Sequence, residues 1–200
     1  PPHPIPLSLI PKTQHVRSLA AALIAEKTSV AADRAATETE VAPPISTFDP
    51  YKKDSNNAKQ AAAWDKVKTD WRRIVAETAS QRADARKSFA DHSALVATEL
   101  ALLDLLMDHY KLSFESDAAT HFLIQATLAD LPQVAETLGK VRAFGAARLA
   151  EAEHLVIAQR SGTELVKDAL TLTDRATMAT LISALTAKTN QATNQLGKAQ

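Results

Sequence analysis

Polar side chains that could bind a small anion occur near the starts of two predicted helices. Thr13, Gln14 and Arg17 interrupt the start of an apolar stripe, and His121 and Gln125 share a helix face because they are four residues apart. A guanidinium binds a carboxylate through paired hydrogen bonds, which hydroxyl, amide and imidazole groups can supplement. If both helix starts lie at one end of a bundle, these residues meet. We therefore predict a site for a small anion there.

Each candidate also has a structural interpretation. Arg17 could be a solvated surface arginine, and His121 could be a histidine held between helices. Arg142 is a further candidate, facing a ligand cavity elsewhere in the bundle, although an arginine in this position can equally be paired or extend to the surface. Trp64 and Trp71 fit an apolar core seam, with ligand stacking as the alternative.

The sequence gives little support for metal binding or catalysis. His92 and His109 are 17 positions apart, and no pair of ligands falls on one helix face, so both are interpreted as structural histidines. A serine–histidine–aspartate arrangement, a phosphate-binding glycine loop and paired carboxylates in an evident cleft are absent. We therefore expect no enzyme, no metal and no cofactor.

The composition predicts an all-α fold. Alanine makes up about a fifth of the 200 residues, whereas glycine (4) and aromatic residues (4%) are scarce. Long β-branched runs with a period of two residues do not occur. The chain is long enough for one domain with a real core, so residues 1–200 are expected to form a single domain.

Charge and hydropathy restrict the partners. The 23 basic and 23 acidic residues balance, and no basic stripe occurs, which argues against nucleic-acid binding. No apolar run approaches the roughly 18 residues of a membrane span, and the first residues do not resemble a signal peptide. The chain thus has the character of a soluble piece. Its lack of cysteine is compatible with the periplasm without proving that location.

Periodicity and proline positions divide the first half into two long helices. After an irregular segment 1–11, one helix is expected from about Lys12 to near Val41, followed by a polar connection over residues 43–56. Asn57 and Gln60 fit a capping box, and no glycine or proline interrupts residues 58–111. This span predicts one very long helix of roughly 80 Å, or two nearly collinear helices.

The second half predicts two further helices. A short turn at 112–116 should reverse the chain, a helix should begin near Asp117, and Pro132 should kink or restart it. A capping box opening at Ser161 predicts the last helix. The two expected seams are Leu131, Ala135 and Leu138, then Met178, Ile182, Leu185, Thr189, Ala192 and Leu196. Four antiparallel segments give an elongated up-down-up-down four-helix bundle, possibly two stacked modules with kinked or broken helices.

Several segments resemble the periplasmic helical-bundle sensor domains of bacterial methyl-accepting chemotaxis proteins. They are residues 13–21, 88–92, 108–113, 117–125 and 131–145. These segments are spread over roughly residues 13–150, about two-thirds of the chain. The middle segments agree with that family in order, spacing and residue type. In the first segment, Ser18 and Ala21 stand where the family tends to have glycine and serine.

The resemblance implies an extracytoplasmic sensor, which would be the periplasmic domain of an inner-membrane protein. Membrane spans flanking the domain would anchor the parent protein. Such a domain binds a small molecule, here an organic acid or other small anion, as a homodimer, and it signals by displacing its last helix. Related domains also precede histidine kinases and diguanylate cyclases. The alternative class is a structural scaffold or adaptor that binds partner helices.

Overall fold

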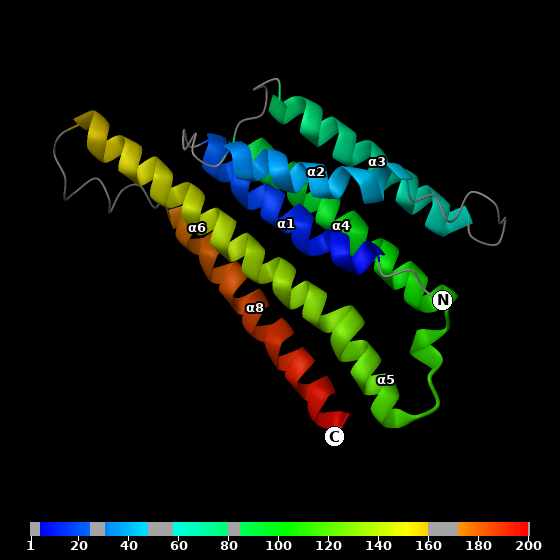
Figure 1. Ribbon diagram of the computed structural model, residues 1–200. Coiled ribbons are helices and arrows are strands. Elements are labelled where there is room, and N and C mark those ends of the chain that lie inside the picture. The colour runs from blue at the N-terminus through cyan, green and yellow to red at the C-terminus, as the bar shows by residue number, and fades with distance from the viewer. Residues whose placement is uncertain (1–4, 25–30, 48–57, 80–84, 160–171, 200) are drawn as a thin grey trace.

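The computed structural model describes residues 5–24, 31–47, 58–79, 85–159 and 172–199, and it confirms the all-α prediction. Across these ranges the chain forms helices and short connections, without a β-strand. The elements gather into two groups that lie side by side, α1 to α4 and then α5 to α8 (Figure 1).

The first two helices form a hairpin instead of the single helix that we predicted. Helix α1 runs from Ile5–Ile24 and α2 from Ala31–Thr47, and an ion pair between Lys12 and Glu40 (3.1 Å) joins them across the antiparallel pair. Residues 5–11, predicted to be irregular, are helical and include Pro11. Helix α2 also continues past Val41 to Thr47, into the predicted connection. Folding back lets both helices bury apolar residues in the same core, which one continuous helix could not do.

Helices α3 (Ala58–Ala79) and α4 (Ala85–His109) form a second antiparallel hairpin, so the prediction of one long or two collinear helices is wrong. Arg73 pairs with Asp91 (3.2 Å), and Lys87 binds both Asp91 (2.7 Å) and Glu77. The apolar seams of α3 and α4 face each other in this arrangement and are buried in one core with residues of α1 and α2. The predicted cap residue Asn57 lies outside the described residues.

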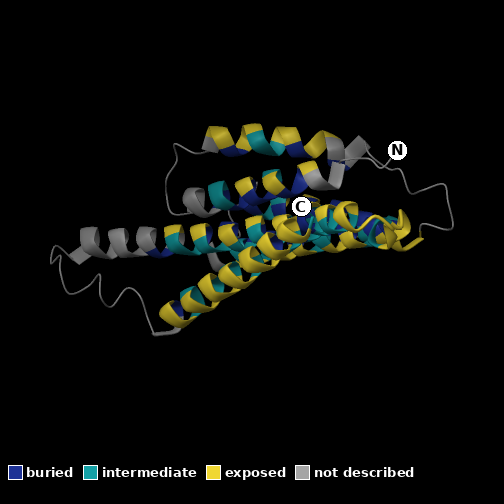
Figure 2. Ribbon diagram, turned by 90° about the horizontal axis from the view of Figure 1, so that it is seen from below, coloured by how far each residue is buried: buried dark blue, intermediate teal, exposed yellow. Residues whose placement is uncertain are grey.

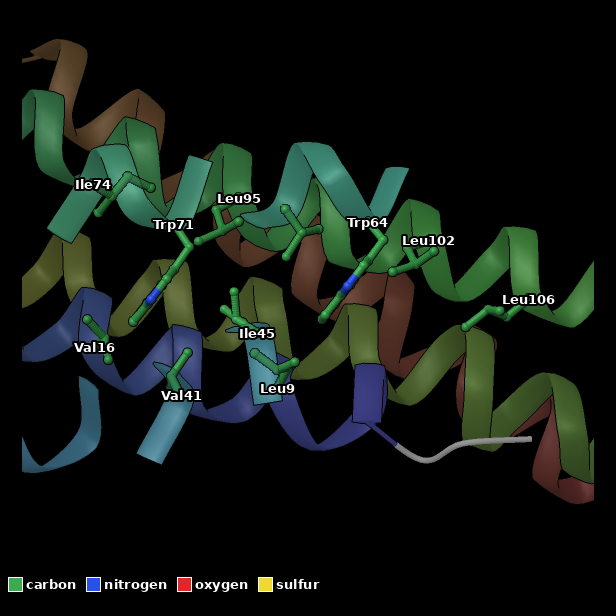
Figure 3. Packing of buried hydrophobic residues seen from close by; sticks show 11 residues of the cluster. Leu9, Val16, Val41, Ile45, Trp64, Trp71, Ile74, Leu95, Leu102 and Leu106 are labelled. Atoms are coloured by element: carbon green, nitrogen blue, oxygen red, sulfur yellow. The ribbon is translucent and has the colours of Figure 1, made fainter. Parts of the chain in front are cut away.

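The main core lies among helices α1 to α4, and both tryptophans belong to it (Figure 3). Trp64 and Trp71 are 1% and 4% exposed, which confirms the predicted core seam. The buried cluster consists of Leu9, Val16, Val41, Ile45, Trp64, Val67, Trp71, Ile74, Leu95, Leu102 and Leu106. Large indole side chains supply much of the apolar surface that holds the two hairpins together.

The chain then turns at the 3₁₀ helix η3 (Leu112–Phe114) and enters the second group. Asp117 caps α5 (Ala118–Ile124) by accepting a hydrogen bond from the Thr120 backbone N–H (2.8 Å), so the predicted helix start is confirmed. A π-helical segment, η4 (Gln125–Asp130), leads into α6 (Leu131–Gln159). Pro132 lacks a backbone N–H, and this irregular segment directly before it agrees with the predicted interruption.

Helix α8 (Leu172–Lys198) returns antiparallel along α6, which itself packs against α1 (Figure 1). The predicted cap at Ser161 lies outside the described residues. Side-chain contacts join α8 to the preceding elements: Gln191 donates to Asp130 (2.7 Å), Arg148 lies 3.7 Å from Asp174, and Lys198 Nζ lies 5.2 Å from the centre of the Phe122 ring. No described helix is long and apolar enough to cross a membrane.

The predicted seams of the last two helices are largely exposed. Leu138 is 54% exposed and Leu131 42%, while the buried face of α6 instead carries Glu136, Gly139 and Ala143. On α8, Ile182 and Leu196 are exposed, and Figure 2 shows exposed residues along almost the whole helix. The periodic pattern thus identified two helices correctly. It assigned the inner face of α6 wrongly, whereas the predicted seam of α8 is half right, since Ala192 is buried and Met178 and Leu185 are partly buried.

Replacing Trp64 tests the hairpin core. Trp64→Ala should lower the free energy of unfolding by about 3–5 kcal/mol, because it removes a large side chain from a closed cluster. The exposed Arg72 on the same helix provides the control, and Arg72→Ala should change stability by less than about 0.5 kcal/mol. Urea unfolding followed by far-ultraviolet circular dichroism measures both values, and similar small losses would contradict the packing.

Candidate functional site

A cluster of buried polar side chains, here called the polar junction, lies where α1, α4 and α6 meet. Such a cluster is unusual because buried charges need paired groups and close hydrogen bonds to offset their lost hydration. The polar junction consists of Thr13, Gln14 and Arg17 on α1, Ser93 and Glu99 on α4, and Glu136 and Gly139 on α6.

Helix α1 places its three polar residues inside because it is covered on several sides. It packs against α2, α4 and α6, so more than one face is removed from solvent. Thr13 is fully buried, Arg17 is 1% exposed and Gln14 is 8% exposed. The interpretation of Arg17 as a solvated surface arginine is therefore wrong.

Arg17 is held by an ion pair with Glu136. Its Nη1 donates to Glu136 Oε1 (2.7 Å) and to Ser93 Oγ (3.1 Å), and its guanidinium lies over the Phe89 ring at 5.6 Å. The two charged side chains are 0% and 6% exposed. Gln14 Nε2 also donates to Glu136 (3.1 Å), and Lys140 adds a second cation at 3.3 Å. The Glu136 carboxylate of α6 therefore binds two residues of α1, Gln14 and Arg17.

The close approach of Arg17 to α6 requires glycine at position 139. A Cβ built on Gly139 would lie 2.7 Å from Arg17 Nη2, closer than real carbon–nitrogen contacts allow. The absence of a side chain thus leaves room for the guanidinium beside the α6 backbone. Glu136 and Gly139 are three residues apart, so both face α1 from the same side of the helix.

Glu99 is the second carboxyl group of the polar junction. Thr13 Oγ1 donates to its Oε1 (2.8 Å), whereas its Oε2 has no hydrogen-bond partner among the described residues. Burial raises the pKa of Glu99 to about 8; the Thr13 hydrogen bond opposes this shift and the charge of Glu136 adds to it. Glu99 is therefore mostly protonated at neutral pH.

His92 directly precedes Ser93 on α4 and is fully buried. Its Nδ1 donates to the Ser88 carbonyl (2.7 Å), with the tautomer assigned from this contact. Burial lowers the pKa of His92 to about 4, with smaller contributions from Arg34 and Arg17, against the raising effects of the Ser88 hydrogen bond and Asp91. His92 is thus a neutral core residue, in agreement with its interpretation as structural.

The structure brings together only part of the predicted anion site. Thr13, Gln14 and Arg17 meet in the polar junction, and Arg142 lies at its edge, where Nη2 donates to Ser18 Oγ (2.9 Å). The side chain of Arg142 is exposed to solvent and does not face an enclosed cavity.

His121 and Gln125 lie away from Arg17, which corrects the prediction that they meet. Helix α6 meets Arg17 at Glu136, 15 positions beyond His121, which corresponds to about 22 Å of helix. His121 instead contacts the edge of Phe122 (5.4 Å between ring centres). The two helix starts lie at different heights because α5 and η4 precede the part of α6 that packs on α1.

The acidic members of the polar junction were not predicted. Glu99 lies three residues after Val96 and four before Leu103, so it occupies a position within the apolar seam of α4. A charged residue at such a position was a usable signal. Burial of Glu136 was harder to predict, because the apolar pattern of α6 favoured the opposite face, with Leu131 and Leu138, as the core.

Comparisons with known proteins add no relative: no protein-family model, no curated protein and no solved structure matches the chain. Within the described ranges, no group of three or more histidine, aspartate or glutamate side chains could hold a metal ion. The polar junction is therefore characterised by its own chemistry, a buried arginine beside two carboxyl groups.

Ionisation of Glu99 should make stability depend on pH. Its pKa is about 8 in the folded chain and near the ordinary glutamate value of 4.5 when unfolded, so its contribution to stability is complete below pH 4.5 and is lost as pH rises to about 8. Glu99→Gln should remove this loss, on the order of a few kcal/mol. Urea unfolding at pH 5 to 9 measures the slope, and an unchanged slope in the variant would contradict the assignment.

Two glycines of α6 provide a matched test of the Arg17 contact. Gly139→Ala should lower the free energy of unfolding by about 1–3 kcal/mol, because the added methyl group displaces the guanidinium from Glu136. Gly145→Ala should raise it by up to about 1 kcal/mol, because its Cβ would lie 3.6 Å from Met178 and alanine favours helix. Thermal unfolding distinguishes them, and equal stabilisation of both would refute the close approach.

Proposed function

We propose that this chain is the periplasmic ligand-binding sensor domain of a bacterial membrane-anchored chemoreceptor. The observation that carries the proposal is the weak attachment of the C-terminal helix. Ala192 is the one buried apolar residue in the described part of α8, and this helix packs chiefly against α5, η4 and α6. A helix held by so little buried surface can shift at low cost, as signalling by helix displacement requires.

The polar junction is the proposed binding element. A small organic acid or other anion would compete with Glu136 for Arg17, assisted by Thr13 and Gln14. Because Arg17 is buried against α6, its transfer to a ligand would have to separate α6 from α1. Binding would then favour the arrangement in which α6 and α8 have moved, by the ligand's difference in affinity for the two states.

We further propose that the sensor acts as a homodimer. Helix α1 offers little surface for such a contact, because it packs against α2, α4 and α6. The exposed apolar residues of the second group offer an alternative surface, comprising Leu123, Leu131, Leu138, Ile182 and Leu196. The same residues also favour the competing function, a scaffold that binds partner helices, since large exposed apolar side chains mark protein contacts.

A thermal-shift screen of organic acids, amino acids, nitrate and aromatic acids tests the binding function. A ligand at about 100 times its Kd adds roughly 2.7 kcal/mol of stability, which raises the Tm of a chain this long by about 5–10 °C. At least one compound should produce such a shift. No shift with any compound, together with binding of isolated amphipathic helices, would favour the scaffold.

Three variants assign the binding to the polar junction. Arg17→Gln should abolish the ligand-induced shift, whereas Glu136→Gln should strengthen binding because it removes the competing carboxylate. Both variants break the Arg17–Glu136 ion pair. If this pair had a purely structural role, both variants would therefore change ligand binding in the same direction. Arg142→Gln is the control on α6 and should leave the shift unchanged. Apolar spans flanking the chain in its parent gene would independently support membrane anchoring.

A further inference from the structure

Large apolar side chains are exposed together on the second group of helices, on a surface here called the outer face. These side chains are between 37% and 54% exposed and comprise Leu123 of α5, Leu131 and Leu138 of α6, and Ile182 and Leu196 of α8. Exposed residues continue along almost the whole of α8 (Figure 2). Apolar side chains gathered in this way mark a contact with another molecule.

The apolar residues of the outer face form two rows that meet where α6 contacts α8. On α6, Leu138 and Gly145 are seven residues apart and share a row. A Cβ on Gly145 would lie 3.6 Å from Met178 of α8. Ile182 lies one turn after Met178, and Leu196 about five turns after it, so the α8 row starts at the same contact. Because both rows are exposed, they border this contact on its solvent side.

The two rows carry large side chains at matching heights. Helix α8 runs antiparallel to α6, and Arg148 lies 3.7 Å from Asp174. Ile182 is eight residues beyond Asp174, and Leu138 is ten residues before Arg148. The two side chains therefore differ in height by only about 3 Å and form one apolar layer.

A second layer lies near the other end of α8. Lys198 Nζ lies 5.2 Å from the centre of the Phe122 ring, which places Leu196 near Leu123 in height. The two layers are about 20 Å apart, and Leu131 lies about halfway between them. This distance corresponds to about two heptads of a helix, so a helix lying along both rows would present an apolar residue to each layer.

The charged side chains that reach solvent on this part of the molecule are basic. Among the described side chains of α5, η4, α6 and α8, the acidic residues Asp130, Glu136 and Asp174 are all buried. The basic residues, apart from the buried Arg148, are exposed or partly exposed, namely Lys140, Arg142, Arg175, Lys188 and Lys198. The surface around the outer face is therefore positively charged.

Two arginines flank the apolar rows directly. Arg142 follows Leu138 by four residues, and Arg175 precedes Ile182 by seven, so each shares a helix side with its row. Both arginines are exposed. A second copy of the chain would present the same basic surface, whereas a partner with acidic side chains complements it.

We propose that the outer face binds an amphipathic helix of another protein, with apolar residues repeated every seven positions and acidic residues beside them. The helix lies along the contact between α6 and α8, its apolar side chains pack against the layers, and its carboxylates pair with Arg142 and Arg175. This inference develops the competing function of a helix-binding scaffold and does not depend on ligand binding at the polar junction. It assigns to another protein the face that the homodimer would use, so the experiment distinguishes these two occupants.

Fluorescence anisotropy with two synthetic helices and the full chain tests the proposal. The acidic probe is about three heptads long, with leucine at two positions of each heptad and glutamate at the positions beside them. The basic probe has lysine in place of each glutamate. The acidic probe should bind saturably, at least about ten times more tightly than the basic probe, and its binding should weaken as NaCl is raised.

Two double variants assign the binding to the outer face. Leu138→Ser combined with Ile182→Ser should weaken binding of the acidic probe about tenfold or more, because one apolar layer is lost. Arg142→Glu combined with Arg175→Glu should reverse the preference in favour of the basic probe, and this reversal tests the face even if the first variant folds poorly. Phe114→Ser is the control, because Phe114 is 79% exposed but lies outside the outer face, and it should leave both affinities unchanged.

Sedimentation equilibrium and vesicles of equimolar phosphatidylglycerol and phosphatidylcholine test the other occupants. A dimer that the Leu138→Ser and Ile182→Ser variant dissociates, without binding of the acidic probe, overturns the inference in favour of a second copy. Vesicle binding that this variant abolishes, again without probe binding, overturns it in favour of a lipid surface. Equal affinity for the two probes, or probe binding that neither double variant changes, also overturns it.

The same measurements separate this inference from the sensor proposal. A stabilising ligand found without any binding of the acidic probe overturns the inference and leaves the sensor proposal in place. Binding of the acidic probe without any stabilising ligand supports the inference and contradicts small-molecule binding.

Discussion

The buried ion pair between Arg17 and Glu136 is the contact on which the attachment of α6 depends. Removing two charges from water is costly, and the cost is offset only where geometry and further hydrogen bonds are good. Several features meet this requirement: Gly139 makes room for the guanidinium, Gln14 and Lys140 bind the carboxylate, and Ser93 ties the arginine to α4. Apolar residues of similar volume would pack here at no greater cost. The pair is therefore better understood as fixing the register of three helices than as maximising stability.

The interactions within the first group of helices differ from those within the second group. Helices α1 to α4 share an apolar cluster that contains both tryptophans, and such a core resists rearrangement because its side chains are closely packed. The second group has little of this kind of contact. The buried residues of α6 that face α1 are polar or small, and the buried apolar residue of α8, among those described, is Ala192. Several large apolar side chains of this group, such as Leu138 and Ile182, are exposed to solvent.

The sequence predicted the elements well but the way they fold back less well. Low glycine and high alanine content predicted helices, Asp117 and Pro132 marked real boundaries, and the spacing of Trp64 and Trp71 predicted a core face. The two hairpin reversals were missed because the residues around 25–30 and 80–84 contain no glycine or proline, so local propensity gave no sign of a break. Arg17 and its neighbours were identified correctly as unusual. Their partners were not, because Glu99 and Glu136 lie 86 and 122 positions from Thr13 and Gln14, and only tertiary packing brings them together.

Incomplete hydrogen bonding at the polar junction has a physical meaning of its own. An unsatisfied buried donor or acceptor costs about 1–3 kcal/mol, and both Arg17 and Glu99 carry such atoms. This cost lowers the stability of the observed arrangement relative to another in which the same groups find partners. Where α6 meets α1, the arrangement can change without disturbing the tryptophan core, because the two are held by separate contacts. The closely packed apolar cluster and the incompletely hydrogen-bonded charged contact are therefore two separate parts of the structure, and the second is the one that stabilises its own arrangement less.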